Sequence, residues 1–223
     1  MTAGEAAAAA RAEQEPEAAD LAVVERQLGR RPRAVRRVAH RCPCGLPDVV
    51  ETAPRLPGGS PFPTLYYLTC PRATAAVARL EAAGVMRQME QRLATDPELR
   101  TAYQAAHRDY LARRDEAARA AGVEPLPFGT QSAGGMPARV KCLHALAAHE
   151  LAVPGANPLG RQALAAAGRW WAAGPCVSPG AARESAVETV VEPQGGRSRA
   201  AGETGADAPQ GTQGGRAGAP EAR

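Results

Sequence analysis

Five cysteines and four histidines are the side chains of this sequence best suited to metal binding or nucleophilic chemistry. Cys42 and Cys44 are separated by one proline and followed by a glycine, and Cys70 comes directly before Pro71. A disulfide between Cys42 and Cys44 would close a strained ring, so two thiolates that bind one ion are the better interpretation of this pair. The spacing therefore predicts a metal site.

A tetrahedral metal site needs a third and a fourth ligand. If Cys42 and Cys70 end the first and third strands of an antiparallel meander, both lie at the same edge of the sheet, and we expect them to cluster with Cys44. Successive helical residues are about 100° apart, which indicates that one helix cannot direct two of its candidate ligands at a single ion. The candidates for the fourth place are Cys142, His144, His149 and Cys176. Cys142 is preferred, with Cys176 and then His149 in reserve. Such a set fits zinc or an iron-sulfur cluster.

The segment 132–144 contains a second group of residues suited to chemistry. A Gly134-Gly135 turn at the start of a helix would expose backbone N–H groups to an anion, with Arg139 and Lys141 in reach of a phosphate or carboxylate. Lys141 and His144 would be neighbours on the helix surface, which makes them candidate catalytic residues. The alternative is an ordinary glycine-rich turn followed by a solvated basic face.

Six arginines fall between Arg30 and Arg41, within a chain of net charge +4. Such a run is typical of a contact with phosphate groups or of a solvated protein surface. No aromatic interleaving or recognition-helix pattern accompanies the run, which argues against nucleic acid as the partner. A solvated face of arginine side chains is the more common case. The sequence leaves the partner open, and a small anionic molecule is a candidate for the segment 132–144.

The order of residue types predicts a small sheet followed by helices. Runs of β-branched and apolar residues between prolines and glycines predict strands over 34–41, 49–53 and 64–69. Helical periodicity and capping residues, Asp20 and Asp96 among them, predict helices over 20–28, 71–93 with a break near Gly84, 97–120, 137–151 and 158–171. We expect an α+β fold in which four to five helices pack on one face of a three-stranded antiparallel sheet.

The two ends of the chain differ from the centre in composition. Residues 1–19 and 179–223 have few large apolar side chains, so we expect disordered tails on either side of one domain over 20–178. No run approaches the roughly 20 apolar residues that cross a bilayer, and no secretory signal is present. We therefore expect a cytoplasmic protein without a membrane span.

Two residue types occur only once in this Arg-rich and Ala-rich sequence. Lys141 is the sole lysine and Asn157 the sole asparagine. Because the composition strongly favours arginine, alanine and glycine, a residue type that occurs only once is a candidate for a specific role.

Three stretches of this chain resemble a known family. They are the segment from Arg26-Gln27-Leu28-Gly29-Arg30 to Arg41-Cys42-Pro43-Cys44-Gly45, the segment 62–72 and the segment 134–145. Together they resemble the bacterial domain-of-unknown-function family 501, which is widespread in actinobacteria. The resemblance covers nearly all of the predicted domain, up to Gly174-Pro175-Cys176. It implies a cytoplasmic actinobacterial protein and brings no established activity.

These observations lead to three hypotheses about function. The first is a small metal-binding protein in which Cys42, Cys44, Cys70 and Cys142 hold zinc or an iron-sulfur cluster. The second is a hydrolase or transferase for an anionic substrate, with Arg139, Lys141 and His144 in the site and Cys142 or Cys70 as nucleophile. The third is a non-enzymatic adaptor that uses the run from Arg30 to Arg41.

Overall fold

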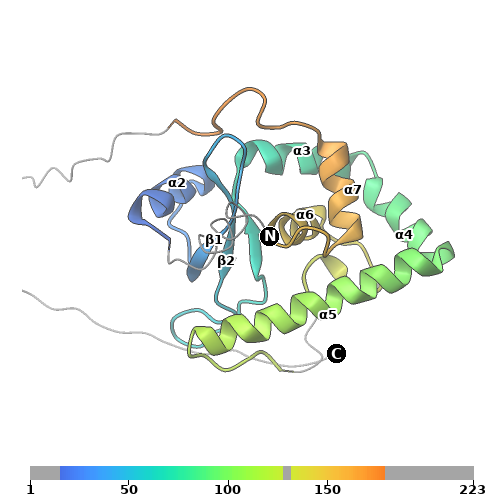
Figure 1. Cartoon of the computed structure of the whole chain (residues 1–223), viewed down its shortest axis with the longest axis horizontal. Helices are drawn as coiled ribbons and strands as arrows, with labels where there is room; N and C mark the ends of the chain where they lie inside the picture. Colours follow the sequence, from blue (N-terminus) through green and yellow to red (C-terminus); the bar gives the residue numbers. More distant parts are fainter. Residues whose placement is uncertain (1–15, 128–131, 179–223) are drawn as a thin grey trace, which may run out of the picture. The chain divides into compact units, whose positions relative to one another are not determined.

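The computed structural model describes residues 16–127 and 132–178. The chain divides into two units, residues 1–183 and 184–223, and the described residues all belong to the first unit. The elements are α2 (Ala18–Leu28), β1 (Val35–Arg41), β2 (Pro47–Thr52), β3 (Tyr66–Leu68), α3 (Pro71–Ala82), α4 (Val85–Thr95), α5 (Pro97–Ala120), the short 3-10 helix η1 (Ala133–Gly135), α6 (Leu143–Ala152) and α7 (Pro158–Ala167) (Figure 1). The α+β prediction is confirmed.

The sheet has the order β1-β2-β3, and both pairs of strands are antiparallel. The turn from Cys42 to Gly45 joins β1 to β2, and Gly45 adopts a φ of 85°, which favours glycine. Side chains alternate between the two faces of a strand. Val49 and Tyr66 accordingly belong to the main apolar core, whereas their neighbours Val50 and Tyr67 face the other way.

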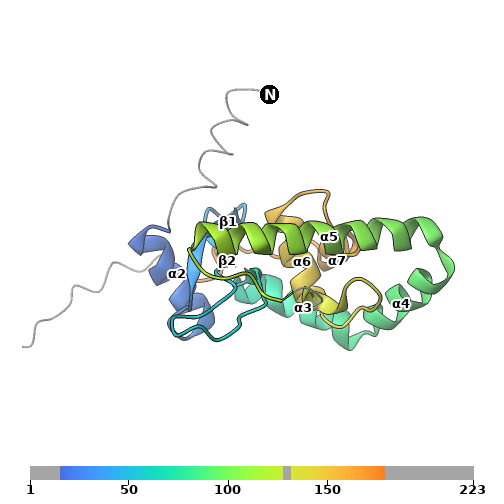
Figure 2. The ribbon, with the colours of Figure 1, turned by 90° about the horizontal axis from the view of Figure 1, so that it is seen from below.

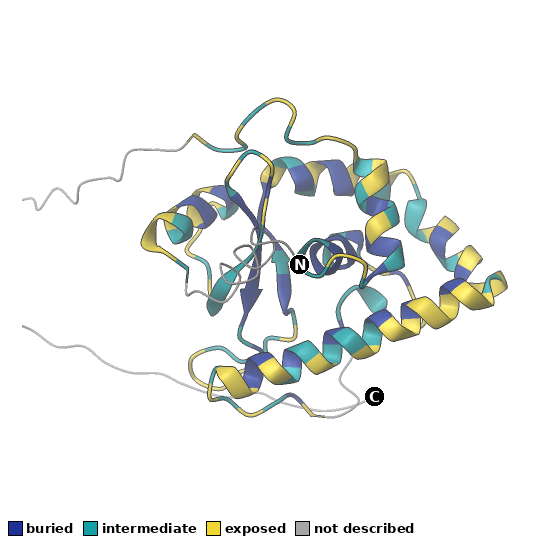
Figure 3. Cartoon of the chain, in the orientation of Figure 1, coloured by how far each residue is buried: buried dark blue, intermediate teal, exposed yellow. Residues whose placement is uncertain are grey.

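Helices cover both faces of the sheet, whereas the sequence predicted helices on one face only. Helix α6 packs against β3 on the core face, and α2 packs against β2 on the opposite side (Figure 1). Helices α3 and α7 pack against α6, so that α6 is largely enclosed. Its residues from Leu146 to Glu150 are all buried, as the dark ribbon in Figure 3 shows.

Helix α5 is the longest element and forms a hairpin with α4 (Figure 2). Asp96 caps α5 as expected, by accepting a hydrogen bond of 2.9 Å from the Leu99 amide, and Pro97 occupies the first turn. The break predicted near Gly84 is present, because Gly84 has a φ of 81° and separates α3 from α4.

Three predicted helix boundaries are wrong. Helix α2 begins at Ala18, so Asp20 lies in its first turn instead of capping it, and the Asp20 carboxylate pairs with Arg41. Helix α6 begins at Leu143, six residues later than predicted, because the chain from Gly134 to Cys142 forms turns and extended backbone. Helix α7 ends at Ala167, ahead of the Trp170-Trp171 pair.

The tails predicted over 1–19 and 179–223 lie outside the described residues, except for residues 16–19, of which the last two are in α2. Among the described helices, none is both long and apolar enough to cross a membrane.

Candidate functional site

The cysteines lie in three separate places. Cys42 contacts Cys44 at the β1-β2 turn, Cys70 contacts Cys176, and Cys142 lies beside His144. No three of the predicted ligands Cys42, Cys44, Cys70 and Cys142, all of which lie in the described part of the chain, have their sulfur atoms within 4.8 Å of one another. The reason is the central strand: β2 separates β1 from β3, which places the ends of the outer strands roughly 10 Å apart, at about 4.8 Å per strand.

Cys42 and Cys70 have the properties of core thiols. Both are buried, and burial is the main reason why the pKa of each rises to about 12. Each thiol is therefore neutral at physiological pH and a poor nucleophile. Cys176, the reserve ligand, accepts a hydrogen bond of 3.3 Å from Gln27 and so links the segment after α7 to α2.

Glu81, Cys142 and His144 form a compact group of potential metal ligands. One donor atom from each lies within 4.8 Å of the other two, and no other group of three or more His, Cys, Asp or Glu residues in the described part of the chain meets this limit. Nδ1 of His144 is 3.2 Å from Oε1 of Glu81 and 3.9 Å from Sγ of Cys142. Sulfur, nitrogen and oxygen donors thus converge on one point.

Helix α3 orients this group through two further contacts. Nε2 of His144 is 3.1 Å from the carbonyl oxygen of Thr74, which leaves Nδ1 as the nitrogen that faces Glu81 and Cys142. Oε1 of Glu81 accepts a hydrogen bond of 2.7 Å from the Leu143 amide at the start of α6. Thr74 and Glu81 are seven residues apart and so share one face of α3.

The pKa values of Cys142 and His144 both depart from their ordinary values. Burial raises the pKa of Cys142, but hydrogen bonds from His144 and from the Ala145 amide lower it more, so the net shift is downward. The hydrogen bond with Cys142, together with the Glu81 charge, raises the pKa of His144 to about 9. Without a metal, the structure therefore favours a thiolate next to an imidazolium.

Cys142 and His144 meet because Cys142 precedes the helix. Its φ of −157° and ψ of 111° are extended, so the 100° spacing that was expected to keep the two side chains apart does not apply. The Gly134-Gly135 turn allows this arrangement. A Cβ at Gly134, which has a φ of 70°, would lie 2.6 Å from the Leu146 side chain and 3.1 Å from the Cys142 carbonyl oxygen.

The Gly134-Gly135 turn of the predicted anion site belongs to the short 3-10 helix η1, and the α-helix that was expected to start there begins at Leu143. Arg139 and Lys141 are exposed, and Nε of Arg139 lies 3.8 Å from a Glu90 carboxylate oxygen. Lys141 and His144 do not share a helix face, since Lys141 lies before α6.

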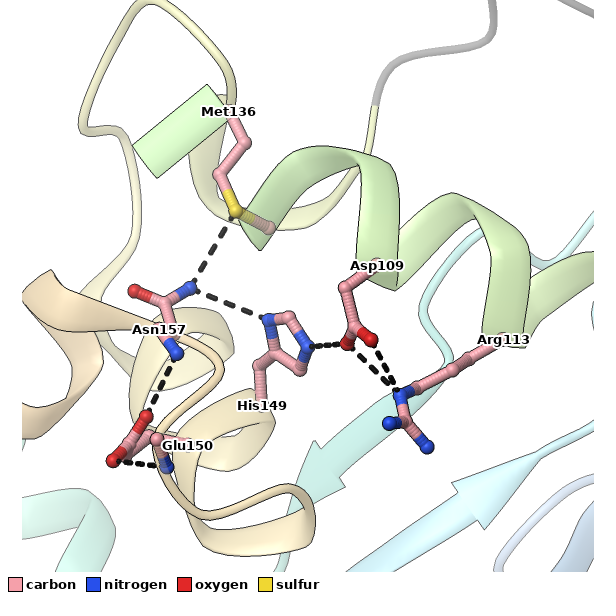
Figure 4. A network of polar contacts seen from close by, with 7 residues as sticks. Asp109, Arg113, Met136, His149, Glu150 and Asn157 are labelled. Carbon is pink, nitrogen blue, oxygen red and sulfur yellow. Dashed lines mark hydrogen bonds and ion pairs between the residues drawn. The ribbon is translucent and has the colours of Figure 1, made fainter. Parts of the chain in front are cut away.

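His149, the other reserve ligand, belongs to a separate buried network (Figure 4). Its Nε2 is 3.0 Å from Asp109, which also accepts hydrogen bonds from Arg113, and its Nδ1 is 3.4 Å from the Asn157 amide nitrogen. Burial lowers the pKa of His149, so the ring is neutral and donates to Asp109. This network joins α5 to α6 and to the start of α7.

Asn157, the sole asparagine, connects several parts of this network. Its Oδ1 caps α7 by accepting a hydrogen bond of 2.9 Å from Gly160, and its backbone amide donates to Glu150. The residue is fully buried. Its unique occurrence in the composition was thus a usable signal.

The arginine run is divided by the fold. Arg36 and Arg37 both pair with Glu51, and Arg41 pairs with Asp20. Arg30, Arg31 and Arg33 are exposed in the segment between α2 and β1. Half of the run therefore makes ion pairs inside the fold: Arg36 and Arg37 connect β1 to β2, and Arg41 connects β1 to α2.

Two members of the candidate site were not predicted. Glu81 is one of several acidic residues on an amphipathic helix, and Thr74 takes part through its backbone carbonyl, so neither has a distinctive sequence pattern. The pairing of Cys142 with His144, two residues later, was the only local signal.

Comparison with known proteins gives one match. No curated protein and no solved structure matches the chain. The family model described as "Protein of unknown function (DUF501)" matches residues 38–165, which include all of β2, β3 and α3 to α6 and every residue of the Glu81, Cys142 and His144 group. Because this match covers more than half of the 223 residues, the chain belongs to the DUF501 family.

Proposed function

We propose that this protein binds one zinc ion through Glu81, Cys142 and His144. The orientation of the His144 ring carries the proposal. Its Nε2 lies at the Thr74 carbonyl, and its Nδ1 faces the other two donors. Metal-binding histidines typically donate their second N–H to a carbonyl or carboxylate, which fixes the tautomer and the ring.

The donor types favour zinc over an iron-sulfur cluster. Zinc accepts sulfur, nitrogen and oxygen ligands in one tetrahedral site. Iron-sulfur clusters are held by four cysteines, or by two cysteines and two histidines. Cys142 is the only cysteine of this group, so the proposal narrows the two cofactors expected from the sequence to zinc.

The number of protein ligands favours a catalytic zinc site over a structural one. Three protein ligands leave the fourth position for water, and the Glu81 and His144 side chains are each 24% exposed, so solvent reaches them. Catalytic zinc sites typically have this composition, and the ion lowers the pKa of its bound water towards 7. Hydrolysis is therefore the class of reaction that we infer.

The second candidate is thiol catalysis without a metal. The lowered pKa of Cys142 and the raised pKa of His144 favour it, because a thiolate beside an imidazolium is the reactive pair of thiol enzymes. It retains Cys142 and His144 from the enzyme hypothesis but assigns no role to Arg139 or Lys141.

Metal analysis separates the two candidates. The full chain is purified without oxygen, its zinc content is measured, and the metal-free protein is titrated with zinc against a chromophoric chelator. The test variants are Cys142→Ser, His144→Gln and Glu81→Gln, the last of which keeps an oxygen for the Leu143 amide. Cys44→Ser is the matched control, since Cys44 lies at the β1-β2 turn with Cys42.

We expect one zinc per chain in the wild-type protein and in Cys44→Ser. The zinc affinity of each test variant should be at least about 100-fold lower, because loss of a metal ligand weakens zinc binding more than loss of a residue that only orients a ligand. Circular dichroism checks that each variant is folded. The absence of stoichiometric zinc, or equal loss of affinity in Cys44→Ser, would overturn the proposal.

A further inference from the structure

A hollow of about 250 Å³ lies on the side of the sheet that faces away from the main core. Leu28 at the end of α2, Val50 of β2 and Phe62 of the loop before β3 form an apolar wall. Tyr67 of β3 also lines the hollow, next in sequence to Tyr66 of the core face. This space lies between α2 and the sheet, apart from the Glu81, Cys142 and His144 group.

Thr52 at this hollow donates its hydroxyl proton to backbone carbonyl oxygens, but three other polar side chains of the lining have no partner in the described ranges. Within the part of the chain that the structure describes, the side chains of Arg30, Arg33 and Tyr67 make no hydrogen bond and no ion pair. The arginines later in the same run are all paired with acids, as Arg36 is with Glu51. No acidic residue lines the hollow among the described residues. Two guanidinium groups therefore stand at an apolar space with no anion beside them.

We propose that this hollow binds a small aromatic anion. A dry cavity of about 150 Å³ holds benzene, so 250 Å³ accommodates an aromatic ring and one acidic group. The ring packs against Leu28, Val50 and Phe62. The guanidinium fork of Arg30 or Arg33 binds the acidic group through two parallel hydrogen bonds, a geometry that carboxylates and phosphates both fit.

The test measures binding of four probes to the full chain by ligand-observed NMR and calorimetry. Phenylacetate and phenyl phosphate carry a ring and an acid of different type, benzyl alcohol carries the ring without charge, and acetate carries the charge without the ring. The variants are the double substitution Arg30→Ala with Arg33→Ala, and Val35→Phe, which fills the hollow from β1. Arg31→Ala is the control, because Arg31 is exposed but does not line the hollow.

We expect at least one ring-bearing acid to bind at least about tenfold more tightly than benzyl alcohol and acetate, since a hydrogen bond to a charged group is worth about one to two powers of ten in affinity. The acid that binds distinguishes a carboxylate ligand from a phosphate ligand. The double arginine variant and Val35→Phe should each lose this binding about tenfold or more, whereas Arg31→Ala should retain it.

Three results would overturn the proposal. Equal binding of benzyl alcohol would mean an apolar hollow without anion selectivity. Equal loss in Arg31→Ala would mean a diffuse basic surface. The absence of binding by any probe, together with a dimer that Val35→Phe dissociates, would mean that a second copy of the chain fills the hollow.

Discussion

Nε2 of His144 lies 3.1 Å from the carbonyl oxygen of Thr74, and this contact determines which nitrogen of the ring faces Cys142. Because Thr74 is in α3 and His144 is in the first turn of α6, the contact also couples the site to the packing of these two helices.

Alkylation should distinguish the cysteines of the zinc-free protein. Cys142 has a lowered pKa and is partly exposed, whereas Cys42 and Cys70 are buried and have pKa values of about 12. We expect iodoacetamide to modify Cys142 at least about tenfold faster than either buried thiol, because the thiolate is the reactive form. Mass spectrometry of peptides gives the rates.

Added zinc should then protect Cys142 from iodoacetamide while leaving the slow modification of Cys70 unchanged. Rapid modification of Cys142 in the presence of saturating zinc would instead favour the thiol-enzyme candidate.

The stability of the fold should depend on pH through His149. Burial lowers the pKa of His149 below the unfolded value of about 6.5, so the unfolded chain binds a proton that the folded chain resists. Its contribution to stability is complete above about pH 6.5 and decreases as the pH falls below that value. Asp109, whose folded pKa is also lowered, loses its contribution only below about pH 4.

Urea unfolding of the zinc-free wild type and of His149→Gln between pH 7.5 and 5 measures this effect. The advantage of the wild type should shrink below pH 6.5 by up to about 1.4 kcal/mol per pH unit. A difference between the two proteins that stays constant over this range would show that folding does not lower the pKa of His149.

Loss of the Asn157 side chain should destabilise the protein by about 2–4 kcal/mol. The substitution Asn157→Ala removes the cap of α7, which costs about 1 kcal/mol of stability. It also leaves the buried Nδ1 of His149 without a hydrogen-bond partner, which costs about 1–3 kcal/mol. Asp96→Ala serves as the control, because Asp96 also caps a helix but has no role in a buried network. Equal losses in the two variants would contradict the importance of the network.

Gly160→Ala should destabilise the protein although alanine favours helices. A Cβ at Gly160 would lie 2.1 Å from the Leu146 carbonyl oxygen, and this backbone atom cannot move aside without separating α6 from α7. We expect a loss of about 1–3 kcal/mol, against a gain of up to about 1 kcal/mol from helix propensity. Thermal unfolding measures the net change in stability. A variant as stable as the wild type would contradict the close contact of α6 with α7.

The sequence allowed the strands, the long helix and its cap to be predicted, because these depend on local patterns. A short run of β-branched residues identifies β2, and Asp96-Pro97 identifies the start of α5. The prediction of a cysteine cluster rests on a shared sheet edge, but β2 lies between the two strands that precede Cys42 and Cys70, and these thiols belong to no group of three within 4.8 Å among the described residues.

The candidate site was predicted only in part. Cys142 and His144 were both named, but the helix was expected to start at Pro137, which would have directed them away from each other. Glu81 comes from a helix 61 residues earlier in the chain, and only tertiary packing of α3 on α6 reveals its place beside Cys142.

X-ray absorption spectroscopy of the zinc-loaded protein counts the atoms bound to the ion by type and so tests whether Glu81, Cys142 and His144 bind it. We expect one sulfur at about 2.3 Å and the remaining ligands as nitrogen or oxygen at about 2.0–2.2 Å. The Cys142→Ser variant should lose the sulfur shell. A shell of three or four sulfurs, which the sequence alone would favour, or a shell without sulfur would contradict the assignment of Glu81, Cys142 and His144 as the ligands.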